Sequence, residues 1–599
     1  MLPCCRTDWW PPWILLLIFC LASAADVSDI CTRCSCQYLQ SAHITETICT
    51  EDQVVLDVNC TTKPKVSENS NQFSIPHGSN VSLLVWLSFD GSNMMTIERN
   101  TFVPFGKFNV TNLSMDNNNL LIIPGNAFSK LKNLTVLSLT NNKIITFSSD
   151  SIKPLGNLRE LDLSWNKLTE IDLSITLDSR NLEHFDVSHN AIEALTVPIT
   201  GTSSLQVLDL SDNRIQLLPL KAFSSFPKLV ILNISNNNIS YVSPDLFEDL
   251  TRLQVLDLSL NRLKVIDSET VVGLGSLIRI HLNHNYLTEV NFAKALKTLN
   301  TLDVGFNNIS SFGNDTLSEV LEKFIVSHNL LEDLNGIFQI FPNLKSLDAS
   351  YNPCSKFPDH VRAGLRELIL DGTMMTSWPA QFPGEGSITH LSMSNITGLR
   401  SLGPNAFSGI IKSRNSTDTE KCATLKISHT SLEDIDEEAF KNLDLCKLDL
   451  SYNRLRWIPE QLMDWASMVG VDLQGNPWNC VCSLQWMVNI IIPATYKADR
   501  ELLEELRCAT PEYLRGKRLV HWYNRPENAL CGKNKKEIML ETKPLAEQGI
   551  TDKIIMSSSP IMIAVFVFLG CIAVLLVLLG FALQRRAIKM RRVRKNRRF

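Results

Sequence analysis

The sequence predicts an α/β repeat solenoid, a curved stack of short coils with a parallel sheet on its concave side, disulfide caps at both ends and one transmembrane helix. Three observations predict this fold class. An apolar pattern recurs along most of the chain, cysteines cluster on either side of the recurring part, and a long uncharged apolar segment lies near the C-terminus. A repeat array grows by stacking, so 599 residues do not require one large core.

The repeat has the form L-x-x-L-x-L-x-x-N-x-L, and in its regular stretches the asparagine returns every 22 to 24 residues. We count 17 units between about residues 84 and 478. In four of them another residue takes the asparagine position, at Ser92, Thr373, Ile396 and Thr430. The others carry the asparagine at Asn118, Asn142, Asn166, Asn190, Asn213, Asn237, Asn261, Asn285, Asn307, Asn329, Asn352, Asn453 and Asn476. A period of this length is typical of a solenoid.

The chemistry of the repeat explains its residue types. Each unit makes one short strand whose leucines point inward, and stacked strands form a parallel sheet. The sharp turn after the strand leaves backbone donors and acceptors inside the coil. An asparagine amide satisfies both kinds, so the asparagines are expected to stack as a buried ladder. Ten residues further on, a second apolar position is expected to stack beneath the convex side, at Phe102, Phe128, Ile152, Phe223, Phe247 and Phe440.

Cysteines mark both ends of the array, where a solenoid needs caps to cover apolar surface. The first cluster has the spacing C-x2-C-x-C-x12-C-x10-C and comprises Cys31, Cys34, Cys36, Cys49 and Cys60. The second cluster comprises Cys480, Cys482, Cys508 and Cys531. In a secreted chain these predict disulfides, and a zinc site is the competing interpretation of C-x2-C-x-C. Cys354 is predicted to be a buried free thiol, and a Cys422–Cys446 disulfide is left open.

With these motifs, residues 31–531 resemble the extracellular leucine-rich-repeat superfamily, whose solenoid is a horseshoe with cysteine-rich caps. The resemblance implies the pairs Cys480–Cys508 and Cys482–Cys531. The N-terminal cluster departs from the family, because it has five cysteines instead of four. Cys60 resembles the last cysteine of the family's N-terminal cap, so Cys49 is the additional cysteine. The disulfide pairing of this cluster is left open.

The two ends of the chain predict a type I plasma-membrane protein. Residues 1–24 have a short positive region, an apolar core and an Ala-Ser-Ala cleavage site, as in a secretory signal peptide; a retained signal anchor is the alternative. Residues 561–583 carry no charge and are long enough to span a bilayer as a helix. Nine basic and no acidic residues follow, which predicts a cytoplasmic tail near anionic lipid headgroups. A net charge of −5 for the chain, with +9 in the tail, leaves −14 for the exterior.

The predicted organisation follows from these boundaries. It comprises a signal peptide at 1–24, an N-terminal cap at 25–80, repeats at 81–476, a C-terminal cap at 477–533, a stalk at 534–560, the span at 561–583 and the tail at 584–599. The repeats are least regular between Asn352 and Asn453, where residues 411–421 are expected to protrude as a loop.

Eleven Asn-x-Ser/Thr sequons fit a secreted exterior. Asn233 and Asn112 are expected to face the concave side, where glycans would cover part of the surface. The full set is Asn59, Asn80, Asn109, Asn112, Asn133, Asn233, Asn238, Asn308, Asn314, Asn395 and Asn415.

The variable strand position between the two inward leucines is often aspartate, which predicts an acidic column on the concave face, with neighbours about 4.8 Å apart. One interpretation is a docking track for a basic partner or a weak calcium site. The other, which we favour, is a structural preference of the repeat. Sugars are expected to cover the early face, so the candidate ligand surface is the later set, Asp303, Asp348, Asp449 and Asp472. Four histidines before the asparagine position are interpreted as exposed turn residues, at His189, His284, His328 and His429.

The sequence predicts a cell-surface recognition, adhesion or co-receptor protein that binds protein ligands through its solenoid. The alternative is an innate-immune pattern-recognition, decoy or accessory receptor. No nucleophile elbow, zinc-protease motif or phosphate-binding glycine loop is present, so neither enzymatic activity nor a cofactor is predicted. The 16-residue tail is too short for a signalling domain. The expected partners are extracellular or membrane proteins, not nucleic acids, and homo- or hetero-oligomers are compatible with this architecture.

Overall fold

The computed structural model describes residues 82–99, 101–197, 201–312, 318–358, 361, 364–376, 387–409, 411, 422–523 and 529–531, and the backbone of 35–38 and 53–59. The predicted signal peptide, stalk, membrane span and tail lie outside these residues. So do the side chains of the N-terminal cysteines, the sequons Asn59, Asn80, Asn314 and Asn415, and most of the expected loop at 411–421. Within the described ranges no helix has the length and apolarity needed to cross a membrane.

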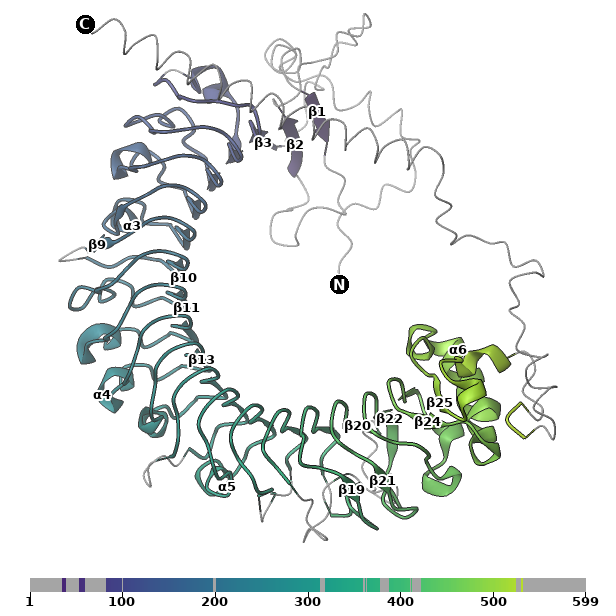
Figure 1. Ribbon diagram of the computed structural model, residues 1–599. Coiled ribbons are helices and arrows are strands. Elements are labelled where there is room, and N and C mark those ends of the chain that lie inside the picture. Colours follow the sequence, from purple (N-terminus) through teal and green to yellow (C-terminus); the bar gives the residue numbers. More distant parts are fainter. Residues whose placement is uncertain are drawn as a thin grey trace, which may run out of the picture. The chain divides into compact units, whose positions relative to one another are not determined.

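The predicted solenoid is confirmed. One short strand per coil enters a 19-stranded sheet in the described chain, and the strands line the inner side of the arc (Figure 1). Pairing is parallel from β2 onward, and β1 pairs antiparallel with β2. The strands of this sheet are β1 (Ser35–Tyr38), β2 (Gln53–Asn59), β3 (Ser82–Ser88), β4 (Val110–Ser114), β5 (Val136–Ser138), β6 (Glu160–Asp162), β8 (His184–Asp186), β10 (Val207–Asp209), β11 (Ile231–Asn233), β12 (Val255–Asp257), β13 (Arg279–His281), β14 (Thr301–Asp303), β15 (Lys323–Ile325), β16 (Ser346–Asp348), β17 (Glu367–Ile369), β18 (His390–Ser392), β20 (Ala423–Lys426), β22 (Leu445–Asp449) and β23 (Gly470–Asp472).

The outer side of the arc is built from turns, short helices and two small parallel ribbons (Figure 1). The α-helices there are α3 (Ile175–Asp178), α4 (Ser268–Val271) and α5 (Ile337–Ile340). The ribbons pair β7 (Glu170–Asp172) with β9 (Ala194–Thr196), and β19 (Ser401–Leu402) with β21 (Asp434–Ile435). The 3-10 helices before the C-terminal cap are η2 (Val103–Lys107), η3 (Ser149–Ser151), η4 (Pro244–Phe247), η5 (Asn291–Ala295), η6 (Glu460–Leu462) and η7 (Trp465–Ser467).

The asparagine ladder holds the coils together as the sequence predicts. In a representative coil, Asn142 Nδ2 donates to the carbonyl oxygens of Met115 at 2.9 Å and Leu139 at 3.0 Å. Its Oδ1 accepts the backbone N–H of Leu120 at 3.1 Å. One buried amide therefore bonds its own turn and the preceding coil. Leaving such a buried backbone group unpaired costs about 1–3 kcal/mol.

The predicted aromatic positions beneath the convex side are buried. Phe102 and Phe128 have ring centroids 5.4 Å apart, and Phe223 lies parallel to Phe247 at 6.2 Å. Between Asn352 and Asn453 the sheet continues without a break through β17, β18 and β20. The loss of the ladder asparagine there therefore leaves the concave face intact.

The end of the solenoid is covered by a cap that begins at Trp478, whose Nε1 donates to the carbonyl of Leu473 at 3.0 Å. The cap contains the disulfides Cys480–Cys508 and Cys482–Cys531, which are the pairs that the resemblance implies. Its elements are β24 (Trp478–Asn479), η8 (Cys482–Leu484), the π-helix η9 (Met487–Ile491), α6 (Ile492–Ala498), η10 (Glu501–Leu503), β25 (Cys508–Thr510), η11 (Glu512–Leu514) and η12 (Leu519–Trp522).

Three further cysteines lie within the described residues. Cys422 and Cys446 form a disulfide between neighbouring coils. Cys354 is a buried free thiol, and burial raises the pKa of this thiol to about 11.

Candidate binding surface on the concave face

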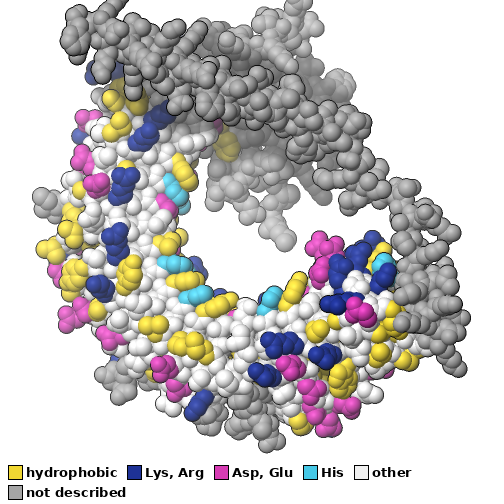
Figure 2. Space-filling view, viewed as in Figure 1, with side chains coloured by type: hydrophobic (Ala, Val, Ile, Leu, Met, Phe, Trp, Pro, Cys, Tyr) yellow, Lys and Arg dark blue, Asp and Glu magenta, His cyan; other side chains and the backbone are white. Residues whose placement is uncertain are grey.

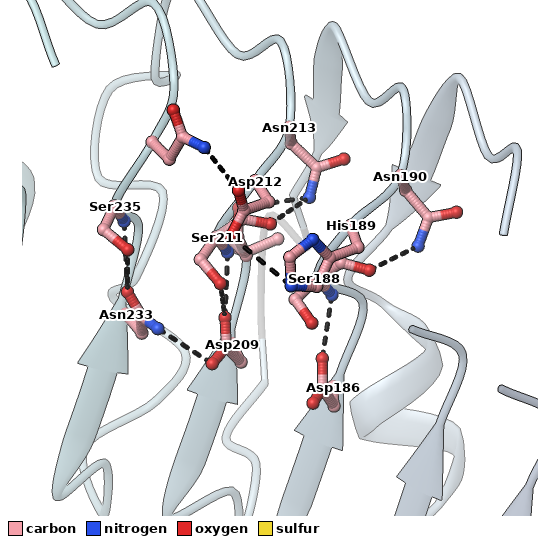
Figure 3. Close-up of polar contacts among 12 residues, drawn as sticks. Asp186, Ser188, His189, Asn190, Asp209, Ser211, Asp212, Asn213, Asn233 and Ser235 are labelled. Carbon is pink, nitrogen blue, oxygen red and sulfur yellow. Dashed lines mark hydrogen bonds and ion pairs between the residues drawn. The ribbon is translucent and has the colours of Figure 1, made fainter. Parts of the chain in front are cut away.

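The aspartates at the strand ends close the turns that follow them. Asp209 Oδ1 accepts the backbone N–H of Ser211 at 2.9 Å and its hydroxyl at 2.6 Å. Asn233 accepts from Ser235 in the same way, and its Nδ2 donates to Asp209 Oδ2 at 2.9 Å (Figure 3). The same backbone bond recurs at Asp162, Asp186, Asp257, Asp303, Asp348, Asp449 and Asp472. A structural preference of the repeat, in which the aspartate closes the turn, is therefore sufficient to explain why aspartate recurs at this position.

The acidic column is interrupted. The strand register places His281 between Asp257 and Asp303, and it places Ile325 and Ile369 on either side of Asp348. The Asp303 carboxylate raises the pKa of His281, and its Oδ2 forms an ion pair with the imidazole Nδ1 at 3.8 Å. Sequence reasoning did not single out His281, although it occupies the same variable position as the aspartates.

Of the four aspartates in the candidate ligand surface, only Asp449 and Asp472 lie on adjacent strands. Asp303 is paired with His281, and Asp348 is isolated among apolar residues. Burial raises the pKa of the Asp472 carboxyl, and the neighbouring Asp449 carboxylate adds to this shift. Of the predicted ligand surface, only the part on the last two strands of the sheet therefore keeps two adjacent aspartates.

These last two aspartates line an open groove of about 600 Å³, which we call the C-terminal groove. Its lining residues come from the end of the sheet and from the cap, where α6 packs beside β23. Most of the surface that lines it is apolar, and one of the apolar side chains there, Val469, is 64% exposed. The other apolar residues that line it include Met468, Ala494, Ala498 and Leu502.

Gly470 opens the groove, because it lies in register with Lys447 but has no side chain. A Cβ added at Gly470 would approach no atom closer than 3.8 Å, so the space beside it is free. Two cations and three carboxylates border this apolar floor, at Lys426, Lys447, Asp449, Asp472 and Asp499. Neither lysine ammonium has a hydrogen-bond or ion-pair partner among the described residues.

A second surface runs along the rim of the concave face, where the residue before the ladder position has a positive φ. His284, Phe306, His328 and Tyr351 have successive ring-centroid distances of 4.1, 3.9 and 4.3 Å, and we call them the ring stack. Figure 2 shows histidine and hydrophobic side chains alternating along this rim. Burial lowers the pKa of His328. The histidines are turn residues, as predicted. The sequence analysis did not predict that they stack on aromatic rings. The sequence feature that indicates this stacking is the aromatic residue at the same position in a neighbouring repeat.

The fold and the groove define a class of protein, a solenoid of leucine-rich coils with an open concave surface. The family model of the leucine rich repeat matches residues 108–168, 157–215, 203–263 and 251–295. Lumican of Oryctolagus cuniculus is 33% identical over 190 residues, which cover 31% of this chain and 81% of the relative. The chain belongs to the leucine-rich-repeat superfamily.

Other relatives match over a smaller share of their length. Lumican of Rattus norvegicus is 27% identical over 31% of this chain and 46% of the relative, so the chain spans less than half of that protein. Tsukushi of Mus musculus is 30% identical over 34% of this chain and 66% of the relative. Among solved structures, the TLR13–ssRNA13 complex has a TM-score of 0.48 at 21% identity, covering 72% of this chain and 58% of that one. A leucine-rich-repeat protein of Leptospira interrogans has a TM-score of 0.49 at 21% identity, covering 70% and 94%.

Proposed function

We propose that this chain is an extracellular recognition protein that binds a protein ligand in the C-terminal groove. The observation that carries the proposal is the composition of the groove. An exposed apolar floor around Val469 is bordered by charged groups, and its two lysines have no partner among the described residues. Protein interfaces have this anatomy, with an apolar centre and a polar rim.

The groove also indicates the chemistry of the ligand. An apolar side chain of the ligand fits over Val469 and Gly470, where the floor is open. An acidic group pairs with Lys426 or Lys447, and a basic group pairs with Asp449. A ligand segment that carries both charges around an apolar anchor therefore matches the groove better than a purely basic one.

We further propose that the ectodomain is anchored as a single-pass type I protein of the plasma membrane and acts in adhesion or as a co-receptor. The support is the signal peptide predicted at 1–24, the span predicted at 561–583 and the basic tail beside anionic lipid. Surface biotinylation of cells that express the full chain tests this placement, and an intracellular, endoglycosidase-sensitive protein contradicts it.

The test of the groove is a screen of the tagged ectodomain, residues 25–560, against an array of secreted and cell-surface ectodomains. Each ligand found is then measured against Val469→Asp and Lys447→Glu. Burying a valine contributes about 1.5–3 kcal/mol, so Val469→Asp is expected to weaken binding about ten- to hundredfold.

The matched control is Val272→Asp, because Val272 is 67% exposed and lies at the end of α4, far from the groove along the chain. This variant is expected to bind like the unmodified ectodomain. Ligands that bind both groove variants with unchanged affinity would place the binding site elsewhere on the solenoid.

A further inference from the structure

The described sequons differ in whether their amide is available. Asn233 uses both of its amide atoms in hydrogen bonds, and Asn395 Nδ2 donates to the hydroxyl of Tyr351 at 3.2 Å. Asn133 Nδ2 donates to Asn109 Oδ1 at 2.9 Å. Asn308, by contrast, is exposed, and its side-chain amide has no hydrogen-bond partner among the described residues.

Asn308 lies between two exposed apolar side chains on the neighbouring coils. Its backbone N–H donates to the carbonyl of Leu287, the residue after Tyr286, at 2.8 Å. The N–H of Leu330 donates at 2.9 Å to the carbonyl of Ile309, the residue after Asn308. Tyr286 is 52% exposed and Leu330 is 53% exposed. The three side chains therefore occupy the same position on consecutive coils.

The ring stack borders this position. Phe306, two residues before Asn308, is held between His284 and His328, which cover its faces and leave it 44% exposed. The exposed side chains of Tyr286, Phe306 and Leu330 thus lie on the coils around Asn308, whose amide has no partner among the described residues, and we call these three side chains the apolar patch. An exposed patch of large apolar side chains on a soluble surface requires an explanation.

We propose that an N-linked glycan on Asn308 covers this patch. The first sugars lie over Tyr286, Phe306 and Leu330, so that their C–H groups contact the aromatic and aliphatic surface. A glycan is bulky and solubilising, which suits a patch that would otherwise promote association. The proposal rests on the secretory placement proposed above, and it removes this face from the surfaces open to a protein ligand.

The test uses the ectodomain secreted from mammalian cells. Peptide mapping by mass spectrometry measures glycan occupancy at Asn308 and at the other sequons. Nitration of tyrosine by tetranitromethane then measures access to Tyr286, with Tyr452, which is 45% exposed and lies far along the chain, as the internal control.

Asn308→Gln and Ser310→Ala both remove the sequon, and the second keeps the asparagine. Both are expected to increase nitration of Tyr286 and the binding of an apolar dye, while nitration of Tyr452 stays constant. Asn133→Gln, which removes a sequon elsewhere, is expected to change neither.

An unoccupied Asn308 overturns the proposal. Occupancy at any other sequon in the same sample then shows whether the failure lies in the patch or in the secretory placement. Occupancy at Asn308 with unchanged nitration of Tyr286 and unchanged dye binding in both variants also overturns it. None of these outcomes depends on a ligand in the C-terminal groove, so the two proposals fail separately.

Discussion

Replacement of Asn261 by alanine removes one rung of the buried asparagine ladder in the regular part of the solenoid. Asn261 Nδ2 donates to the carbonyls of Ile234 at 3.0 Å and Leu258 at 3.2 Å, and its Oδ1 accepts the N–H of Ile239 at 3.0 Å. The asparagine is 5% exposed, so no water replaces these bonds at low cost.

The two kinds of lost bond have different consequences. The carbonyl of Ile234 also accepts from Asn237, and that of Leu258 also accepts from Asn285, so each keeps one partner. The backbone N–H of Ile239 keeps no hydrogen-bond partner among the described residues. An orphaned buried group costs about 1–3 kcal/mol and each of the two lost carbonyl bonds about 0.5–1.5 kcal/mol, which predicts a loss of about 2–6 kcal/mol in the free energy of unfolding.

Chemical denaturation of the purified ectodomain, followed by circular dichroism, measures this loss. Asn157→Ala is the matched control, because Asn157 is exposed and makes one hydrogen bond, to the carbonyl of Lys132 at 3.2 Å. Its cost is expected to stay below about 1 kcal/mol, as for most surface substitutions. Equal stability of the two variants would refute the account of the ladder.

Three further predictions concern the groove, the free thiol and the concave histidine. Gly470→Leu fills the open floor of the groove and is expected to abolish binding of a groove ligand without lowering the melting temperature, as binding and thermal-shift assays together measure. Cys354 is expected to resist iodoacetamide at pH 8 in the folded protein and to react once unfolded, because the thiol is buried and its pKa is about 11. The neighbouring Asp303 carboxylate raises the pKa of His281, so the stabilising contribution of His281 is fully present below the unfolded value of 6.5 and is lost as pH rises through the folded value. The wild-type ectodomain is therefore expected to lose more stability than His281→Gln as pH rises above about 6.5, and identical pH profiles would exclude the effect.

The sequence determined the solenoid, because each coil is specified by a pattern contained within one repeat. Inward leucines and the ladder asparagine recur at a constant spacing, and burial acts on every unit in the same way. For the same reason the buried aromatic positions at Phe102 and Phe223 were predictable. The C-terminal disulfides followed from the resemblance of the cysteine spacing to a known cap.

Only the tertiary structure decided which surface residues lie together. His281 interrupts the acidic column because neighbouring strands align in register, and that alignment joins residues more than 20 positions apart. The groove exists because α6 of the cap packs beside β23, and no repeat encodes that contact. Whether an amide is bonded, as at Asn233, or has no partner within the described ranges, as at Asn308, depends on side chains from adjacent coils. A repeat pattern specifies which residues point inward; the neighbours that each outward residue meets arise only when the coils stack.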